Sequence, residues 1–277
     1  MMKAGLHSTS LEAVERAFTK QAVHYDQHDC QNPILTAWRR RVYDHVERFL
    51  KPDSSMLELN AGTGIDAVYF VNQGHHVHAT DQSGGMVKEI ETKISLQNLS
   101  GQLSVAQCSY DSLEIEDRRK FDYIFSNFGG LNCIQDLSRV TRQFPNILHP
   151  GGFVTLVIMP PLCPWEWGMM FKWNFKKAFR RLSRNGTISH LEGEHFMTYY
   201  HSVGKISAAM GDRFKLVGAE SLGLFSPPPH KGEFARRYPV IHNFLSQLDR
   251  LGGIFPLSRW GDHVMVTFRM RYSPRDA

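Results

Sequence analysis

Two acidic side chains frame a glycine-rich turn between residues 56 and 81. Glu58 lies at the end of the apolar segment MLEL, the turn NAGTG follows it, and Asp81 ends the alternating segment 76–80. This order of apolar runs and glycines predicts a strand, a tight turn and a helix, and then a second strand. Open α/β sheets bind nucleosides at the carboxyl ends of their strands, where an acidic side chain can accept hydrogen bonds from both ribose hydroxyls. The segment therefore predicts a nucleoside site.

Two kinds of nucleoside ligand compete for this turn. Residues 62–67, GTGIDA, satisfy the G-x-G-x-x-A dinucleotide fingerprint, which is a weak signal when it stands alone. Asp66 falls in the first turn of the predicted helix, where a pyrophosphate needs bare backbone N–H groups and the positive dipole end. A carboxylate there disfavours a phosphate, whereas Glu58 suits a ligand with a positive ammonium and a sulfonium. These residues favour S-adenosylmethionine over a dinucleotide.

Residues 58–64, ELNAGTG, and 80–86, TDQSGGM, resemble motifs one and two of class I S-adenosylmethionine-dependent methyltransferases. Residues 121–127 and 148–153 are similar to the fourth strand of that family and to its turn into the fifth. Asn60 stands where the family usually has glycine, and asparagine adopts left-handed backbone more readily than other non-glycine residues. The resemblance implies S-adenosyl-L-methionine as cofactor and S-adenosyl-L-homocysteine as product.

The resemblance also extends to the flanks of these motifs. Tyr25, in the segment 22–26 before a helix, resembles the lid tyrosine of ubiquinone and menaquinone biosynthesis methyltransferases, and packing on the sheet is the alternative. After the third strand the family normally has an aspartate that contacts the adenine, and this chain has Cys108-Ser109-Tyr110 there, so Ser109 is the best substitute. Met86 is similar to the residue that covers the adenine, although a helical methionine is often core. The predicted cofactor-binding residues are Tyr25, Glu58, Asn60, Ala61, Gly62, Gly64, Asp81, Gln82, Met86, Ser109 and Asn127.

The elements that position these residues alternate along the chain. Strands are predicted at 56–59, 76–80, 103–107, 121–127, 153–159, 214–225 and 263–271, and helices at 11–18, 34–50, 65–72, 85–96, 136–144, 203–210 and 234–251. This alternation predicts an α/β fold with a doubly wound, mostly parallel sheet, here a seven-stranded Rossmann-like methyltransferase sheet with an inserted cap. We divide the chain into a helical lid (1–50), a cofactor-binding core (51–160), the cap (161–202) and a part that completes the sheet (203–277), which includes a substrate-side loop and helix at 226–260.

Composition and charge indicate the cellular compartment, the state of the cysteines and whether a metal site is expected. The 277 residues carry a net charge of +5, and the first thirty contain charges but no apolar run, so we expect a cytoplasmic protein without a signal peptide or membrane span. Four scattered cysteines form no C-x-x-C pair and are expected to be reduced thiols. The histidines at 75, 76 and 78 have no acidic or thiol residue nearby in sequence, so no metal site is expected.

The predicted cap, from Pro160 to about residue 200, combines tryptophans with a basic segment. Within 171–184, Phe171, Phe175, Ala178, Phe179 and Leu182 share one helical face, and Lys172, Lys176, Arg180 and Arg184 share another. A solvated cap helix is one interpretation of this pattern. A docking surface for an anionic membrane, an acidic carrier protein or RNA is the other.

Acceptor and acid–base residues are predicted from the segments that flank the core. Tyr200 and His201 end the cap and lead back to the sheet, so we predict them as acid–base or orienting groups, with a structural role as the alternative. Trp165, Trp167, His230 and Tyr238 are predicted to line the acceptor pocket. The hypothesis is a methyltransferase acting on a hydroxyl or activated carbon of a small-to-medium lipophilic metabolite, without a metal. The alternatives are an RNA methyltransferase and a noncatalytic S-adenosylmethionine-binding protein.

Overall fold

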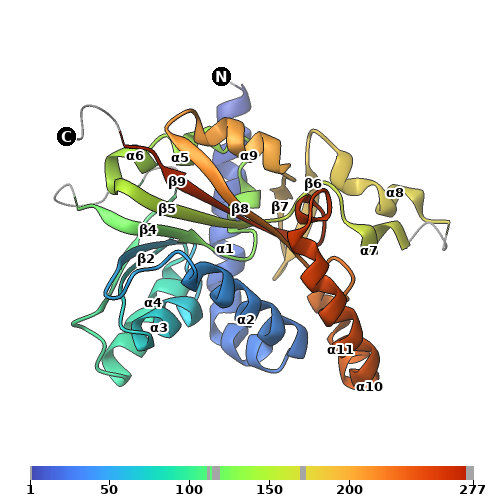
Figure 1. Ribbon diagram of the computed structural model, residues 1–277, viewed down its shortest axis with the longest axis horizontal. Coiled ribbons are helices and arrows are strands. Elements are labelled where there is room, and N and C mark those ends of the chain that lie inside the picture. Colours follow the sequence, from blue (N-terminus) through green and yellow to red (C-terminus); the bar gives the residue numbers. More distant parts are fainter. Residues whose placement is uncertain (1, 111–112, 114–118, 169–172, 273–277) are drawn as a thin grey trace.

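A seven-stranded sheet with the order β3-β2-β1-β4-β5-β9-β8 runs through the centre of the molecule (Figure 1). The computed structural model describes residues 2–110, 113, 119–168 and 173–272. Strands β1 to β5 are parallel, and β9 is antiparallel to both of its neighbours. The strands are β1 (Ser55–Leu59), β2 (His76–Asp81), β3 (Leu103–Gln107), β4 (Phe121–Ser126), β5 (Leu148–Ile158), β8 (Phe214–Leu222) and β9 (His263–Met270). The predicted fold class is confirmed.

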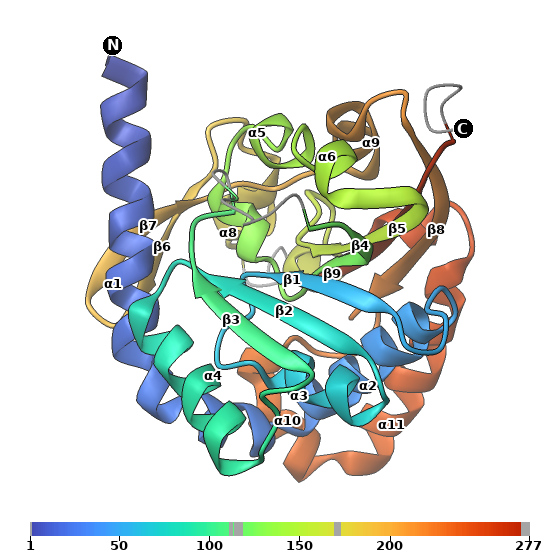
Figure 2. The same cartoon turned by 90° about the vertical axis from the view of Figure 1, so that its left-hand side faces the viewer.

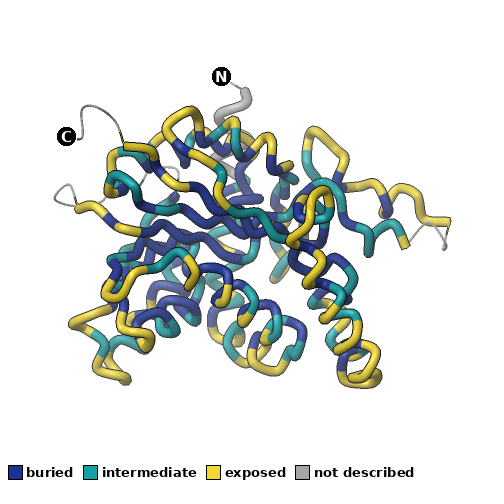
Figure 3. Tube along the Cα trace, viewed as in Figure 1, coloured by how far each residue is buried: buried dark blue, intermediate teal, exposed yellow. Residues whose placement is uncertain are grey.

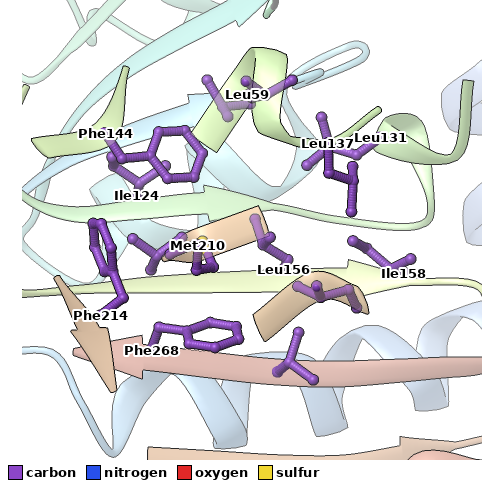
Figure 4. Close-up of a cluster of buried hydrophobic side chains, with 14 of the residues drawn as sticks. Leu59, Ile124, Leu131, Leu137, Phe144, Leu156, Ile158, Met210, Phe214 and Phe268 are labelled. Carbon is purple, nitrogen blue, oxygen red and sulfur yellow. The ribbon is translucent and has the colours of Figure 1, made fainter. Parts of the chain in front are cut away.

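Helices cover both faces of this sheet (Figures 1 and 2). One face carries α2 (Pro33–Glu47), α3 (Ile65–Asn72) and α4 (Gly84–Leu96), and the other carries α5 (Ser138–Thr141), α6 (Phe144–Ile147) and α9 (Val203–Met210). Successive strand residues therefore enter different cores: Met56 packs with α2 and α3, whereas Leu57 packs with α9. Figure 4 shows the second of these cores, and Figure 3 shows the central strands buried beneath the helices.

Two helices that were predicted as continuous are interrupted. The segment 136–144 forms α5 and reaches only the first residue of α6, and the segment 234–251 forms α10 (Gly232–Arg237) and α11 (Pro239–Leu248). Proline lacks a backbone N–H and is tolerated in the first turn of a helix, which is where Pro145 of α6 and Pro239 of α11 lie. The sixth predicted strand ends at Leu222 rather than at residue 225.

The cap contains short elements in place of the predicted amphipathic helix. It consists of α7 (Pro164–Trp167), α8 (Phe175–Ala178), η4 (Arg180–Leu182) and an antiparallel hairpin of β6 (Thr187–Leu191) and β7 (Glu194–Thr198) that was not predicted. The expected apolar face was wrong, because Phe175, Phe179 and Leu182 are exposed while Ala178 and Arg181 are buried. Phe171 and Lys172 of that prediction lie outside the described residues.

One long helix, α1 (Met2–Cys30), connects the sheet to the cap hairpin. Its Thr19 hydroxyl lies 2.8 Å from that of Ser83 at the start of α4, and its Arg16 and Lys20 side chains contact Glu194 of β7 at 3.0 and 2.8 Å. Figure 2 shows α1 standing beside the hairpin. Within the part of the chain that the structure describes, no helix is both long enough and apolar enough to cross a bilayer.

Candidate cofactor and acceptor site

A cavity lies under α1 at the carboxyl ends of β1, β2 and β4, and we call it the cofactor cavity. Its lining residues come from α1, from the glycine-rich turn and from the ends of β2 and β4. They are Val14, Phe18, Tyr25, Asn60, Gly62, Asp81, Gln82, Met86, Tyr110, Asn127, Phe128, Gly130 and Cys133. Seven of the residues predicted to bind the cofactor are therefore brought together: Tyr25, Asn60, Gly62, Asp81, Gln82, Met86 and Asn127.

Asp81 presents a carboxylate to this cavity at the end of β2. Its Oδ2 accepts a 2.9 Å hydrogen bond from the backbone N–H of Gly62, and its Oδ1 accepts one of 2.9 Å from Ser83. Burial raises the pKa of Asp81 to about 6, although these N–H donors act in the opposite direction. Each oxygen retains a lone pair, so the carboxylate can still accept from a ribose.

Glu58 carries a buried carboxyl group in which one oxygen lacks a hydrogen-bond partner. Its Oε2 makes no hydrogen bond to any described residue, and desolvation and the nearby Asp66 carboxylate hold the pKa of Glu58 well above its usual range. A buried carboxylate is costly unless a cation or hydrogen-bond donors compensate it. A ligand carrying an ammonium beside the turn would supply that compensation. Glu58 itself does not line the cavity.

Asn60 adopts the left-handed backbone expected of it, with φ +47°. Its side-chain Nδ2 donates to the carbonyl of Asn127 at 3.0 Å, and its Oδ1 accepts from the Ser126 hydroxyl at 2.6 Å. Gly130 packs so closely that a Cβ there would lie 2.4 Å from Asn60 Cγ. The asparagine thus joins the turn after β1 to the end of β4, which a glycine could not do.

Arg39, which was not predicted as a site residue, lies beside this turn and binds two buried carboxylates. Its guanidinium holds both oxygens of Asp29 at 2.9 and 2.8 Å and also contacts Asp66. Asp66 further accepts hydrogen bonds from Tyr43 at 2.6 Å and from Asn127 at 2.9 Å. The carboxylate predicted to repel a phosphate is therefore buried in an ion-pair network.

A second cavity adjoins the first, and we call it the acceptor cavity. It is lined by residues of α1 and α2, by the turn after β4, by Pro229 and by the first residue of β9: Gln21, Tyr25, His28, Asp29, Leu35, Phe128, Pro229 and His263. Tyr25 and Phe128 line both cavities. A molecule in the second cavity would therefore meet a ligand in the first across these two rings. His263 was missed, and its only signal was the polar pair Asp262-His263 before an apolar strand.

The structure does not bring Tyr200 and His201 to either cavity. His201 is buried, donates from Nε2 to the Ile134 carbonyl at 2.9 Å, and has its pKa lowered to about 4 by burial. The Tyr200 hydroxyl lies 3.0 Å from that of Thr187 in the hairpin. Both side chains fasten the cap to the sheet, so their placement supports the structural alternative.

The four predicted acceptor residues also lie away from the lining of both cavities. The Trp165 indole donates to the Phe225 carbonyl at 2.9 Å, and Trp167 packs edge-on against Trp260. His230 and Tyr238 are exposed, although the neighbouring Pro229 lines the acceptor cavity. Three predicted cofactor residues, Ala61, Gly64 and Ser109, are likewise absent from the cofactor cavity's lining, while Tyr110 is part of it.

One cluster outside these cavities has the donor set of a metal site. Cys163, Glu166 and Asp262 place their ligand atoms within 4.8 Å of one another. The Arg181 guanidinium already bonds both carboxylates, at 2.8 Å to Glu166 and 2.6 Å to Asp262. A cation is thus supplied by the chain itself, and we assign the cluster to ion pairing.

Comparison with known proteins identifies the domain that holds the cofactor cavity. A family model described as "Methyltransferase domain" matches residues 56–152. Demethylmenaquinone methyltransferase from Corynebacterium efficiens is 26% identical over 168 residues, which is 57% of this chain and 66% of that protein. The chain carries a class I S-adenosylmethionine-dependent methyltransferase domain. The same enzyme from Geobacillus kaustophilus is 26% identical over 53% of this chain and 63% of its own length, so the chain spans slightly less than two thirds of these relatives.

Solved structures share the fold of this methyltransferase domain over nearly the whole chain. The CcbJ methyltransferase from Streptomyces caelestis has a TM-score of 0.59 at 15% identity and covers 91% of this chain and 96% of its own. A protein described as a putative S-adenosylmethionine-dependent methyltransferase from Listeria monocytogenes has a TM-score of 0.57 at 14% identity and covers 83% and 96%. At these identities the likeness establishes the fold.

The cofactor of this methyltransferase domain is S-adenosyl-L-methionine, which supplies a methyl group on a positively charged sulfur. The residues around the cofactor cavity fit it. Asp81 can accept from the ribose, and Met86 offers an apolar surface for the adenine. Glu58 is buried outside the lining, so it would favour the ammonium of the methionine end through its charge and not by direct contact.

Proposed function

We propose that the protein transfers a methyl group from S-adenosylmethionine to a hydroxyl or an activated carbon of a small-to-medium lipophilic metabolite. The observation that carries this proposal is the contact between the two cavities through Tyr25 and Phe128. The acceptor cavity has apolar walls from Leu35, Phe128 and Pro229 together with a few polar groups, which is typical of pockets for small apolar molecules. The name of the curated relatives, demethylmenaquinone methyltransferase, agrees with such an acceptor.

The main demand on the protein is positioning. Methyl transfer is an in-line displacement at a carbon that the sulfonium already activates, so holding the acceptor in line provides much of the rate enhancement. Tyr25 and Phe128 are suited to orient a flat acceptor because both aromatic residues line both cavities. A base is needed only when the attacking atom carries a proton.

We expect formation of S-adenosylhomocysteine that depends on an added acceptor. The test incubates the protein with S-adenosylmethionine and panels of quinols, hydroxylated aromatics and lipid-soluble hydroxyl compounds, and measures both the product and the methylated acceptor by mass spectrometry. Asp81→Ala serves as the control because it should abolish turnover at the same cofactor concentration. Cofactor binding without turnover across these panels and whole-cell lipid extracts would favour the noncatalytic alternative.

We further propose that one end of the molecule docks on an anionic membrane, and we call it the basic apolar end. It comprises residues 173–184 of the cap and 231–259 around α10 and α11, which lie at the same end of the long axis (Figures 1 and 3). Exposed apolar side chains gather there, with Trp173 84% and Val240 80% exposed. The others are Phe175, Phe179, Leu182, Tyr238, Ile241, Phe244, Leu251, Ile254 and Phe255.

The charge of the basic apolar end also favours an anionic membrane as its partner. The two segments contain ten Lys and Arg but only two acidic residues, which leaves 22 basic and 25 acidic residues in the rest of the chain. One of those two acids, Asp249, is buried, and so is one of the ten basic residues, Arg181. Apolar side chains ringed by cations match the interface of an anionic bilayer, where a lipophilic acceptor would reside. Pro229, which begins η5 (Pro229–Lys231) just before α10, lines the acceptor cavity and connects it to this end.

We expect capture by phosphatidylglycerol vesicles that weakens with salt, and no capture by phosphatidylcholine vesicles. Reversing Lys176 and Lys177 to Glu should lower the bound fraction at least tenfold, since each cation near such a surface contributes about 1 kcal/mol. Arg180 is unsuitable for this test because it bonds Glu166. A double variant Val240→Ser with Phe244→Ser should also weaken capture at unchanged charge, and affinity for S-adenosylmethionine should be unaffected.

Two outcomes would contradict a membrane as the partner. Salt-sensitive binding to transfer RNA that the lysine variant loses would identify RNA as the partner. Binding to an acidic carrier protein in place of vesicles would identify a protein as the partner.

A further inference from the structure

His263 and Asp262 form a pair at the wall of the acceptor cavity. The Nδ1 of His263 lies 3.0 Å from Asp262 Oδ2, as an ion-pair contact in which the ring N–H is not yet aligned for a hydrogen bond. The imidazole stands edge-on to two rings, those of Trp38 and Phe128, each with its centroid 5.9 Å away. These two rings fix the plane of the imidazole. Its Nε2 makes no hydrogen bond to another described residue.

The cap holds the Asp262 carboxylate in its charged form. Arg181 of η4 donates from Nη2 to Asp262 Oδ1 at 2.6 Å and from Nη1 to the Asp262 carbonyl at 2.7 Å. Burial would raise the pKa of Asp262, but the ion pair with Arg181 holds it far below its usual range. Glu166 accepts from Arg181 Nε at 2.8 Å and fixes the guanidinium in turn. Asp262 is therefore a buried anion that faces His263.

We propose that His263 is the general base that removes the proton from the methyl acceptor and that Asp262 positions it. This inference rests on the proposed function and assigns the proton transfer within it. A carboxylate beside Nδ1 favours the tautomer with the proton on that nitrogen, so the lone pair is on Nε2. Nε2 is the ring nitrogen left free to face an acceptor in the cavity.

Together, His263 and Asp262 account for the proton and the charge in the proposed reaction. As the bond from the acceptor oxygen or carbon to the methyl carbon forms, the carbon–sulfur bond breaks and its electron pair remains on the sulfur. The acceptor proton passes to Nε2 of His263, so one positive charge disappears at the sulfur and one appears on the imidazole. The Asp262 carboxylate stabilises the resulting imidazolium. The proton then leaves to solvent through the acceptor cavity.

The other titratable groups at this cavity are poorer candidates. Asp29 is engaged by Arg39 through both oxygens. Burial raises the pKa of Tyr25 to about 12, so its phenol stays protonated near neutral pH. His28 lies on α1 next to His24, 6.3 Å between ring centroids, and has no carboxylate contact among the described residues. His263 alone combines a carboxylate partner with a place in the lining.

We expect His263→Gln to lower kcat about 100-fold while the Kd for S-adenosylmethionine changes less than twofold, which is the range for loss of a general base. Asp262→Asn should give a smaller loss. His76→Gln is the matched control, because His76 also lies beside a carboxylate, at 3.2 Å from Asp53, but lines neither cavity, so kcat should stay within about threefold. His28→Gln tests the other histidine of the acceptor cavity as a rival base. The rise in rate with pH that reports deprotonation of the base should be absent in His263→Gln and present in His76→Gln.

A measurement without turnover distinguishes this inference from the proposed function. In ¹⁵N-labelled protein, the imidazole of His263 should show the Nδ1–H tautomer, and Asp262→Asn should shift the population toward Nε2–H. If no acceptor is turned over, the proposed function is contradicted. The tautomer measurement still tests the contact between His263 and Asp262. The inference is overturned if His263→Gln or the alternative His263→Asn turns over at the wild-type rate. It is also overturned if His28→Gln carries the loss, or if the tautomer is the same with and without the Asp262 carboxylate.

Discussion

Replacing Arg39 with methionine should lower the free energy of unfolding by about 3–5 kcal/mol, the range for removing one partner of a buried ion pair. Arg39 lies between Asp29 and Asp66, which are both buried, and it is the cation that both carboxylates contact. Methionine keeps the aliphatic part of the side chain but leaves both carboxylates without their cation. Urea unfolding followed by circular dichroism measures the change.

The neighbouring arginine provides the matched control. Arg40 is exposed on the same helix and pairs with Asp44 at 3.0 Å one turn later. Because exposed pairs contribute little, Arg40→Met should change stability by less than about 1 kcal/mol. Adding Asp29→Asn and Asp66→Asn to Arg39→Met should recover part of the loss. Equal and small effects of the two single variants would contradict the assigned role of Arg39.

Replacing Asp81 with alanine should weaken S-adenosylmethionine binding roughly 100-fold or more, because hydrogen bonds to a charged group contribute about 1.5–3 kcal/mol each and a ribose can donate two. The substitution also frees the N–H groups of Gly62 and Ser83, which shape the turn and the start of α4. Isothermal titration calorimetry measures the Kd. Asp122→Ala is the control, since Asp122 bonds Ser55 at the opposite ends of β4 and β1. Unchanged affinity in Asp81→Ala would remove this residue from the cofactor site.

Binding should also weaken as the pH falls below about 6. Burial raises the pKa of Asp81 to about 6, so the carboxylate that accepts from the ribose is progressively protonated below that pH. The affinity should then approach a tenfold loss per pH unit. In Asp81→Asn, the part of the pH dependence of affinity that comes from Asp81 should be absent. We assign any remaining loss of affinity at low pH to protonation of Glu58. A wild-type affinity that is flat between pH 7 and 5 would contradict the assignment.

The cofactor half of the site could be predicted from sequence because its parts are local. The turn after β1 and Asp81 at the end of β2 belong to one continuous strand–turn–helix–strand unit, so their order along the chain also gives their place in space. Seven of the predicted cofactor-binding residues line the cofactor cavity. Residues such as Ala61 and Gly64, predicted with them, support the turn without lining the cavity.

The acceptor half depends on contacts between distant segments. Arg181 and Asp262 are 81 residues apart, and neither shows a periodicity that indicates the other. The same contact explains the wrong prediction for the cap, because Glu166 and Asp262 draw Arg181 into the interior and turn Phe175 and Phe179 outward. Helical periodicity shows which residues share a face, but the partners available elsewhere in the fold decide which face is buried.

Helix α1 makes the departure of product a separate event from the chemistry. It contributes Val14, Phe18 and Tyr25 to the lining of the cofactor cavity, whose volume of about 90 Å³ is smaller than that of an ordinary nucleoside pocket. We therefore expect α1, which contacts the hairpin through Arg16 and Lys20, to shift when the cofactor enters and when the product leaves. The interval between turnovers then depends on how long this helix stays docked. Substitutions at those exposed ion pairs could retune the speed of the enzyme over evolutionary time without altering any residue that contacts the acceptor.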